Sequence, residues 1–145
     1  MSPPTVLNSS KVHLRYSLPS DGPLLYRLYL DSGKSPLEGI DWTGDVGGYW
    51  IVAEVDGVAM GCIQVCPSLP IARVELLCVP VDVPYRLKAR LVSKLTDMAK
   101  VVCRKLGAQA ISYVFHPTRY KDWPRIAQRR GAVKWASGDM YLMKV

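Results

Sequence analysis

Two spacings of apolar residues run through this 145-residue chain. One repeats every second residue, as in KVHLRYSL at 11–18, and is typical of strands with one buried face. Together with longer β-rich runs, this spacing predicts strands over 11–18, 49–65, 73–81 and 108–116. Asp56–Gly57 divides the run 49–65. Because this dipeptide suits positive φ angles, we expect a hairpin with a type I′ turn there.

The second spacing repeats about every 3.6 residues and predicts helices over 24–33, 85–107 and 120–131, each closed by a glycine. The region 34–48 is rich in glycine and proline and is expected to be a loop. A last hairpin should turn at 137–139. The polar, Pro/Ser-rich residues 1–10 are expected to form a flexible tail, which leaves 11–145 as one domain.

The resulting order is β-α-β-β-β-α-β-α-β-β. It predicts an α/β fold with a mixed, mostly antiparallel central sheet of about six or seven strands and helices on both faces. The strand 73–81, the helix 85–107 and the strand 108–116 should form a parallel crossover. Ligands of such sheets bind beyond the carboxyl ends of the strands. The stretch VDVPYRLKARL at 81–91 occupies that position.

Three cations, Arg86, Lys88 and Arg90, lie at the predicted start of the long helix. Helix N-termini and basic side chains both bind phosphate, so this stretch is a candidate anion site. The charge distribution agrees, because residues 73–145 hold 15 basic and 5 acidic residues, whereas 1–72 hold 4 and 7. A basic half favours a phosphorylated cofactor, a nucleic acid or an acidic protein surface. A helix that simply begins with solvated basic residues is the alternative.

Other features limit the class of protein. No apolar run reaches the length of a membrane span, and residues 1–11 do not resemble a secretory signal, so we expect a cytoplasmic protein without a membrane partner. The cysteines, Cys62, Cys66, Cys78 and Cys103, form no CxxC pair, and the chain has two histidines. We therefore expect reduced, buried thiols and no metal site.

Three segments resemble the GCN5-related N-acetyltransferase (GNAT) superfamily. IVAEVDGVAMGCIQV resembles its central hairpin, VDVPYR resembles the entry to its acetyl-CoA loop, and IAQRRGAVKW resembles its late helix end. The resemblance covers 11–145 and implies acetyl-CoA as cofactor. In the family, a loop reading R/Q-x-x-G-x-G/A holds the pyrophosphate.

The corresponding residues here are Arg86, Leu87, Lys88, Ala89, Arg90 and Leu91. Ala89 and Leu91 stand where the family has glycines, and the loss of a glycine limits how closely a phosphate can approach the backbone. The resemblance also implies cofactor contacts at Val79 and Val81.

Catalysis in the family needs a base for the amine and often a tyrosine acid for the departing thiolate. The candidate bases are Glu75 and His116. Tyr120 is the first candidate to replace the family's tyrosine acid, and Tyr141 is the second. The family's own tyrosine position is occupied here by Ala127. Both candidate bases also have a structural explanation: Glu75 can point to solvent, and His116 can cap a turn.

Two functions remain open at this point. The first is an acetyl-CoA-dependent N-acetyltransferase that acts on an amine of a small molecule or protein by direct attack. Acids of the loop, Glu38, Asp41 and Asp45, would suit a cationic amine, or they are simply solvated. The second is a catalytically impaired GNAT-like protein, similar to divergent phage versions, that binds a host protein. Nucleic acid ranks third because no reading motif is present. Exposed strand edges would also allow a homodimer.

Overall fold

The computed structural model describes residues 11–36, 40, 42–43, 48–114, 123–134 and 140–144. The predicted tail, the turn at 137–139, and the candidates His116 and Tyr120 lie outside these ranges. The elements, in chain order, are β1 (Val12–Tyr16), the 3-10 helix η1 (Pro19–Asp21), α2 (Gly22–Asp31), β2 (Tyr49–Val55), β3 (Val58–Cys66), β4 (Ile71–Cys78), α3 (Tyr85–Lys105), β5 (Ala110–Val114), α4 (Trp123–Arg129), β6 (Val133–Lys134) and β7 (Met140–Lys144).

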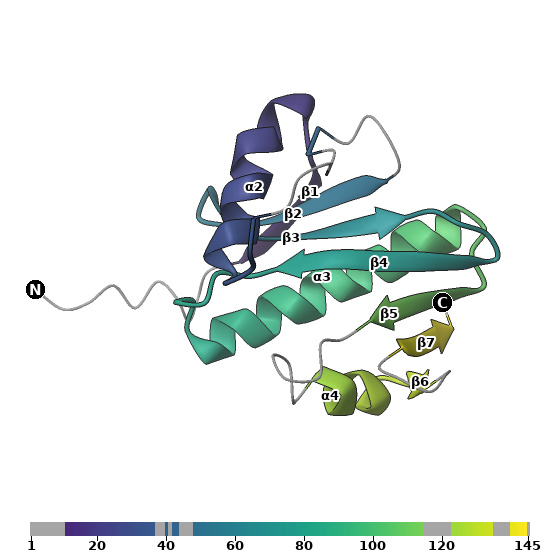
Figure 1. Cartoon of the computed structure of the whole chain (residues 1–145). Coiled ribbons are helices and arrows are strands. Elements are labelled where there is room, and N and C mark those ends of the chain that lie inside the picture. Colours follow the sequence, from purple (N-terminus) through teal and green to yellow (C-terminus); the bar gives the residue numbers. More distant parts are fainter. Residues whose placement is uncertain are drawn as a thin grey trace, which may run out of the picture.

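One mixed sheet holds every strand of the described residues, in the order β1-β2-β3-β4-β5-β7-β6 (Figure 1). All neighbouring strands are antiparallel except β4 and β5, which are parallel and are joined through α3. The predicted α/β class, the element order and the parallel crossover are confirmed. The order was predictable because each element carries its own period of apolar residues.

The turns also follow the sequence. Asp56 and Gly57 have φ angles of 52° and 78°, so both central residues of the β2–β3 turn have the positive φ that a type I′ turn requires. Three further glycines, each with positive φ, follow the three α-helices closely, at Gly33, Gly107 and Gly131. Such residues end helices because a left-handed conformation costs glycine little.

The end of β4 differs from the prediction. We expected a strand over 73–81, but β4 ends at Cys78. Pro80 has no N–H to donate to a neighbouring strand, and the chain turns there before α3. The amide of Val81 instead donates to the carbonyl oxygen of Asp31, at the end of α2, at 3.0 Å.

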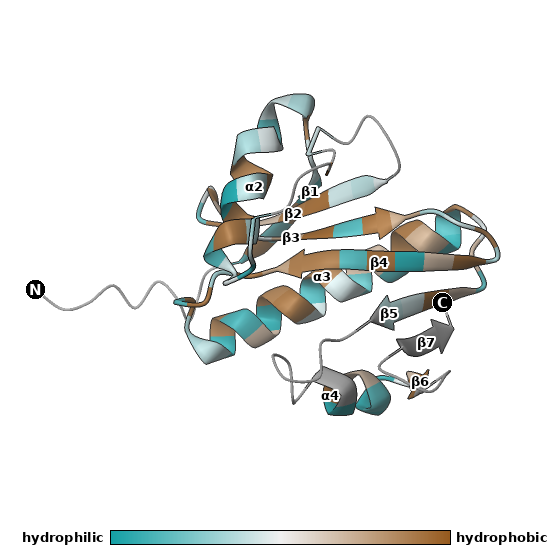
Figure 2. Ribbon diagram, viewed as in Figure 1, coloured by the Kyte–Doolittle hydropathy of each residue, from teal (hydrophilic) through white to brown (hydrophobic). Residues whose placement is uncertain are grey.

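The two faces of the sheet carry separate cores. Figure 2 shows hydrophobic residues along α3 and the central strands in brown. On one face, α3 buries a stripe of apolar side chains, Leu87, Leu91, Leu95, Ala99 and Val102, against β2, β3 and β4. On the other face, α2 packs Leu25, Leu28 and Tyr29 against Trp50 and Cys62. Helices therefore cover both faces, as predicted. No helix in the described part of the chain has both the length and the apolar character needed to cross a membrane.

Candidate active site

Strands β4 and β5 pair over only part of their length. Their register joins Ile71–Val74 to Ala110–Tyr113, and β4 then continues for four more residues to Cys78. In this part of β4, Leu76 has a φ of 51°, and the register with β3 shifts between Cys62 and Gln64. A bulge of this kind bends a strand and increases its twist. The two parallel strands consequently diverge towards their carboxyl ends (Figure 1).

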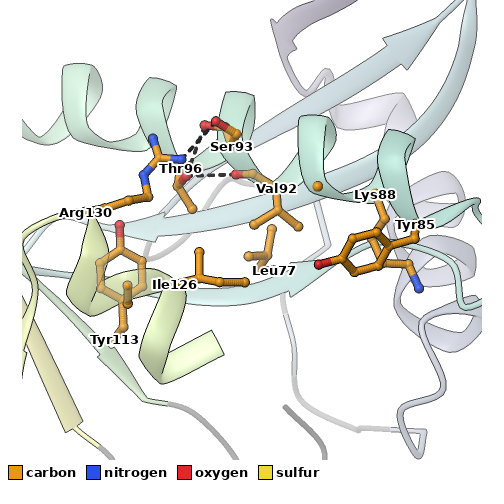
Figure 3. Close-up of a pocket in the computed structure, with 11 residues that line it drawn as sticks. Leu77, Tyr85, Lys88, Val92, Ser93, Thr96, Tyr113, Ile126 and Arg130 are labelled. Carbon is orange, nitrogen blue, oxygen red and sulfur yellow. Dashed lines mark hydrogen bonds between the residues drawn. The ribbon is translucent and has the colours of Figure 1, made fainter. Parts of the chain in front are cut away.

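A cavity of about 140 Å³ lies beside the diverging strands. Its walls come from α3, α4, β4 and β5, and they are mostly apolar. The lining residues are Leu77, Tyr85, Lys88, Ala89, Val92, Ser93, Thr96, Tyr113, Ile126, Ala127 and Arg130 (Figure 3). Ile126 and Tyr85 are exposed although they are large and apolar. The cavity therefore offers an open apolar surface to a ligand.

The two ends of the cavity differ in chemistry. At one end, the Arg130 guanidinium donates to Ser93 Oγ at 2.9 Å and pairs with Asp97, which ties α4 to α3. At the other end lie Tyr85 and Lys88 at the start of α3 (Figure 3). The Lys88 ammonium donates to the Val81 carbonyl oxygen at 3.4 Å, so it stays close to the turn before the helix.

Comparison with known proteins gave a clear structural likeness. No protein-family model matches the chain, and no curated protein is similar in sequence. Among solved structures, an acetyltransferase of the GNAT family from Staphylococcus aureus Mu50 aligns with a TM-score of 0.74 at 12% identity, covering 92% of this chain and 99% of that one. The chain has the GNAT fold.

Two further GNAT-fold structures are informative because they contain coenzyme A. PaiA N-acetyltransferase from Thermoplasma acidophilum aligns with a TM-score of 0.72 at 14% identity, over 93% of this chain and 99% of its own. YhbS from Escherichia coli aligns with a TM-score of 0.67 at 16% identity, over 99% of this chain and 84% of its own. These identities are low, so the likeness establishes the fold alone.

The predicted cofactor residues divide into those in or beside the cavity and those that do not face it. Lys88 and Ala89 line the cavity, and Arg86 and Arg90 are exposed on the neighbouring surface of α3. The predicted loop is helical here, because α3 already begins at Tyr85. Leucine, lysine, alanine and arginine are good helix formers, and no glycine interrupts them.

The remaining predicted cofactor residues do not face the cavity. Leu87, Leu91 and Val79 are buried in the core between α3 and the sheet. Leu91 therefore points away from the surface on which a phosphate would rest, whereas Ala89 faces it with a single methyl group. Val81 is exposed, but its amide already donates to Asp31.

The start of α3 keeps the features of an anion site. Pro84 occupies the N-cap position and has no side-chain acceptor to offer. The first N–H groups of a helix have no partner within the helix. The Lys88 amide is the first to form such a bond, to the Pro84 carbonyl oxygen at 2.8 Å. The first turn of α3 and the cation Lys88 thus lie at the same end of the cavity, and Arg86 is exposed on the neighbouring surface.

Glu75 lies on the opposite face of the sheet from the cavity. Its carboxylate is 3.5 Å from the Arg73 guanidinium and accepts a hydrogen bond from the Cys66 thiol at 3.8 Å. The side chain is 43% exposed, so solvent and an incoming amine can reach it. Its strand position directly follows Val74, the last residue of β4 that pairs with β5. Glu75 is therefore beside the point at which the strands separate.

Tyr113 is a cavity residue that the sequence analysis missed. Burial raises the pKa of its phenol well above the ordinary value, so the hydroxyl stays protonated at neutral pH. Ala127, at the position where the resemblance places a tyrosine acid, also lines the cavity. A methyl group cannot donate a proton, and the phenols among the lining residues of the cavity are those of Tyr113 and Tyr85.

A signal for the cavity was present in the sequence. Tyr85, Ala89, Val92 and Thr96 follow one another at spacings of four, three and four residues. These residues form a second stripe along α3, beside the apolar stripe that packs on the sheet. A helix packs on a sheet with one stripe, so the second stripe indicates a further contact or a ligand surface. Within the described residues, no group of three or more His, Cys, Asp or Glu side chains could hold a metal ion.

Proposed function

We propose that the protein is an acetyl-CoA-dependent N-acetyltransferase that transfers an acetyl group to an amine of a small molecule or protein by direct attack. One observation carries this proposal. An apolar cavity lies beside the separating ends of two parallel strands, and the cationic start of α3 stands at its mouth. The structures of PaiA and YhbS with coenzyme A support it, because they share this fold.

The cavity fits part of the cofactor. Its 140 Å³ is less than the several hundred Å³ that a whole drug-sized ligand occupies, so it suits a narrow chain. The apolar walls of Val92, Ile126 and Leu77 would contact the pantetheine arm. Arg86 and Lys88 would pair with the phosphates outside the cavity, since phosphate accepts charge-assisted hydrogen bonds from both side chains.

Residues beside the gap between β4 and β5 would accept the proton of the amine and stabilise the departing thiolate. Acetyl-CoA supplies a thioester whose carbonyl carbon accepts the amine. Glu75 would take the proton that the amine releases, because its carboxylate is exposed beside the gap. Tyr113 would stabilise the departing thiolate by donating a hydrogen bond from its hydroxyl, because burial raises the pKa of this phenol and keeps the proton on its oxygen. The two groups lie on opposite faces of the sheet, so amine and cofactor would enter from opposite sides.

The first test measures cofactor binding by calorimetry. We expect Arg86→Ala, Lys88→Ala and Arg90→Ala combined to weaken coenzyme A binding by about ten- to a hundredfold, because each exposed ion pair contributes up to about 1 kcal/mol. The loss should shrink at high salt, which screens these charges. Arg104→Ala combined with Lys105→Ala, at the far end of α3, is the matched control and should leave affinity unchanged. Equal affinity of the triple variant would contradict the assigned phosphate site.

The second test concerns the proposed base. We expect Glu75→Gln to lower the acetyl transfer rate by about a hundredfold, the usual contribution of a positioned base, without changing coenzyme A affinity. A thiol-release assay over a panel of amines measures this rate. Asp56→Asn in the β2–β3 turn serves as a control carboxylate. An unchanged rate in Glu75→Gln would remove this residue from the mechanism.

A second function is favoured by the substitutions at family positions. Ala127 cannot act as an acid, and neither Ala89 nor Leu91 is a glycine. These losses fit a GNAT-like protein that binds a partner without catalysis. The absence of any binding heat at millimolar coenzyme A would favour this function over the enzyme.

A further inference from the structure

Two cysteines face each other across neighbouring strands. Cys62 of β3 and Cys78 of β4 are register partners in an antiparallel pair, and both side chains belong to the core on the α2 face. Directly opposed residues of antiparallel strands have Cα atoms about 4.5–5.5 Å apart. This separation lies within the range that a disulfide spans. Both thiols are free and fully buried.

A lysine from another segment reaches the same site. The Lys34 ammonium, just after α2, lies 3.6 Å from Cys78 Sγ and donates to Ser32 Oγ at 2.8 Å. It also donates to the Leu77 carbonyl oxygen at 3.2 Å. Ser32 Oγ in turn donates to the Tyr29 carbonyl oxygen at 2.6 Å, which fixes the orientation of the serine. The ammonium is thus held beside one of the two sulfurs.

The surroundings shift the pKa values of the two thiols in opposite directions. The pKa of Cys78 falls from 9.0 to about 7, mainly because its thiolate accepts a hydrogen bond from the Cys62 thiol. Burial opposes this shift, and the positive charge of Lys34 adds to it. The pKa of Cys62 rises, since its proton is shared with Cys78 and the site is buried. The titratable groups facing Cys78 are Cys62 from β3, Lys34, and Tyr29 from α2, whose hydroxyl donates to the Ser35 carbonyl oxygen.

We propose that Cys62, Cys78 and Lys34 form a redox-active dithiol site that hydrogen peroxide converts to a disulfide between β3 and β4. Cys78 is the attacking sulfur, Cys62 is the resolving sulfur, and Lys34 stabilises the thiolate. Peroxide oxidises cysteines according to their thiolate character and their access, and a neighbouring lysine raises the first of these. A small uncharged oxidant suits a buried site, which larger reagents reach only after local opening.

The reaction balances in two steps. The Cys78 thiolate attacks one peroxide oxygen, the O–O bond breaks, and hydroxide leaves, which takes up the proton released when Cys78 ionised. Cys78 is then a sulfenic acid. The Cys62 sulfur attacks the Cys78 sulfur, the S–O bond breaks, and water leaves with the thiol proton. Two thiols and one peroxide thereby give one disulfide and two waters.

The site adjoins the cavity without being part of it. Leu77, whose side chain lines the cavity on the other face, directly precedes Cys78, and its carbonyl oxygen accepts a hydrogen bond from Lys34. Oxidation would remove the thiolate that Lys34 faces and would link β4 covalently to β3. The redox state of the pair therefore changes the surroundings of the strand segment that borders the cavity.

The experiment treats the reduced full chain with one equivalent of hydrogen peroxide and maps the products by mass spectrometry. We expect a Cys62–Cys78 disulfide, with the loss of two hydrogens, that a dithiol reductant reverses. The rate should be half-maximal near pH 7, following the Cys78 thiolate. Cys62→Ser should stop at a sulfenic acid on Cys78, which a dimedone adduct detects. Cys78→Ser should form neither product.

Variants of Lys34 test the electrostatic part. Lys34→Gln should slow oxidation at pH 7 several-fold and move the half-maximal rate to higher pH, whereas Lys34→Arg should retain most of the rate. Far-UV circular dichroism before treatment checks the fold of each variant. Oxidation that begins at Cys66 or Cys103, or no oxidation of Cys78 in the wild-type chain, would overturn the proposal. If Cys78→Ser does not fold, the dimedone result on Cys62→Ser still decides it.

Discussion

Ala89→Trp should weaken coenzyme A binding by at least about a hundredfold, or about 2.7 kcal/mol. Ala89 lines the cavity and is exposed on α3, so an indole there fills the space that the cofactor arm needs without disturbing the core. A surface helix position tolerates tryptophan with a small change in the free energy of unfolding. Calorimetric titration with coenzyme A measures the effect.

Lys94→Trp is the matched control for this substitution. Lys94 is also exposed on α3, but it lies outside the cavity lining. The control should bind coenzyme A as the wild type does, and both variants should melt within a few degrees of it. If Ala89→Trp bound coenzyme A normally, the cavity between α3 and α4 would not be the cofactor site, whatever the role of the cations at the start of the helix.

Leu95→Ala should lower the free energy of unfolding by about 2–5 kcal/mol, the usual cost of truncating a fully buried leucine. Leu95 is completely buried and packs α3 on the sheet. The contact with β3 is close, because a Cβ built on Gly61 would lie 3.2 Å from Leu95 Cδ1. Few neighbours can move to fill the space, since strands β2 and β3 are held on both sides. Urea unfolding measures the change.

Lys94→Ala, one residue earlier, separates burial from helix propensity. This exposed side chain should change the free energy of unfolding by less than about 0.5 kcal/mol. Because alanine is the best helix former, neither substitution lowers helix propensity, and a similar loss in both variants would contradict burial of Leu95 as the cause. A loss confined to Leu95→Ala would locate the stabilising contact between α3 and β3.

Local patterns predicted the order of the elements. They did not always predict the residue at which an element ends. The Asp56–Gly57 turn and the glycines after the helices were predictable because backbone conformation there depends on the residue itself. The end of β4 was placed three residues too late. Val81 looked like a strand residue, but its amide bonds to Asp31, which is fifty positions earlier in the chain.

The candidate site was predicted only in part. Lys88 was identified from its place at a helix start and Ala89 from the resemblance to the acetyl-CoA loop, and both residues line the cavity. Tyr113 on β5, Ile126 on α4 and Arg130 just after α4 were missed because they meet α3 only when the chain folds. Nothing in the sequence spacing shows that Arg130, just after α4, pairs with Asp97.

The sequence by itself determined the class of fold, the order of its elements, the turn between β2 and β3, and the basic start of α3. These properties depend on residues close together in the chain, whose local conformational preferences agree with the final fold. Only the tertiary structure decided how far β4 and β5 stay paired, which side chains enclose the cavity, and that Lys34 meets Cys62 and Cys78. Strand register and helix packing set these contacts, and both depend on residues far apart in sequence.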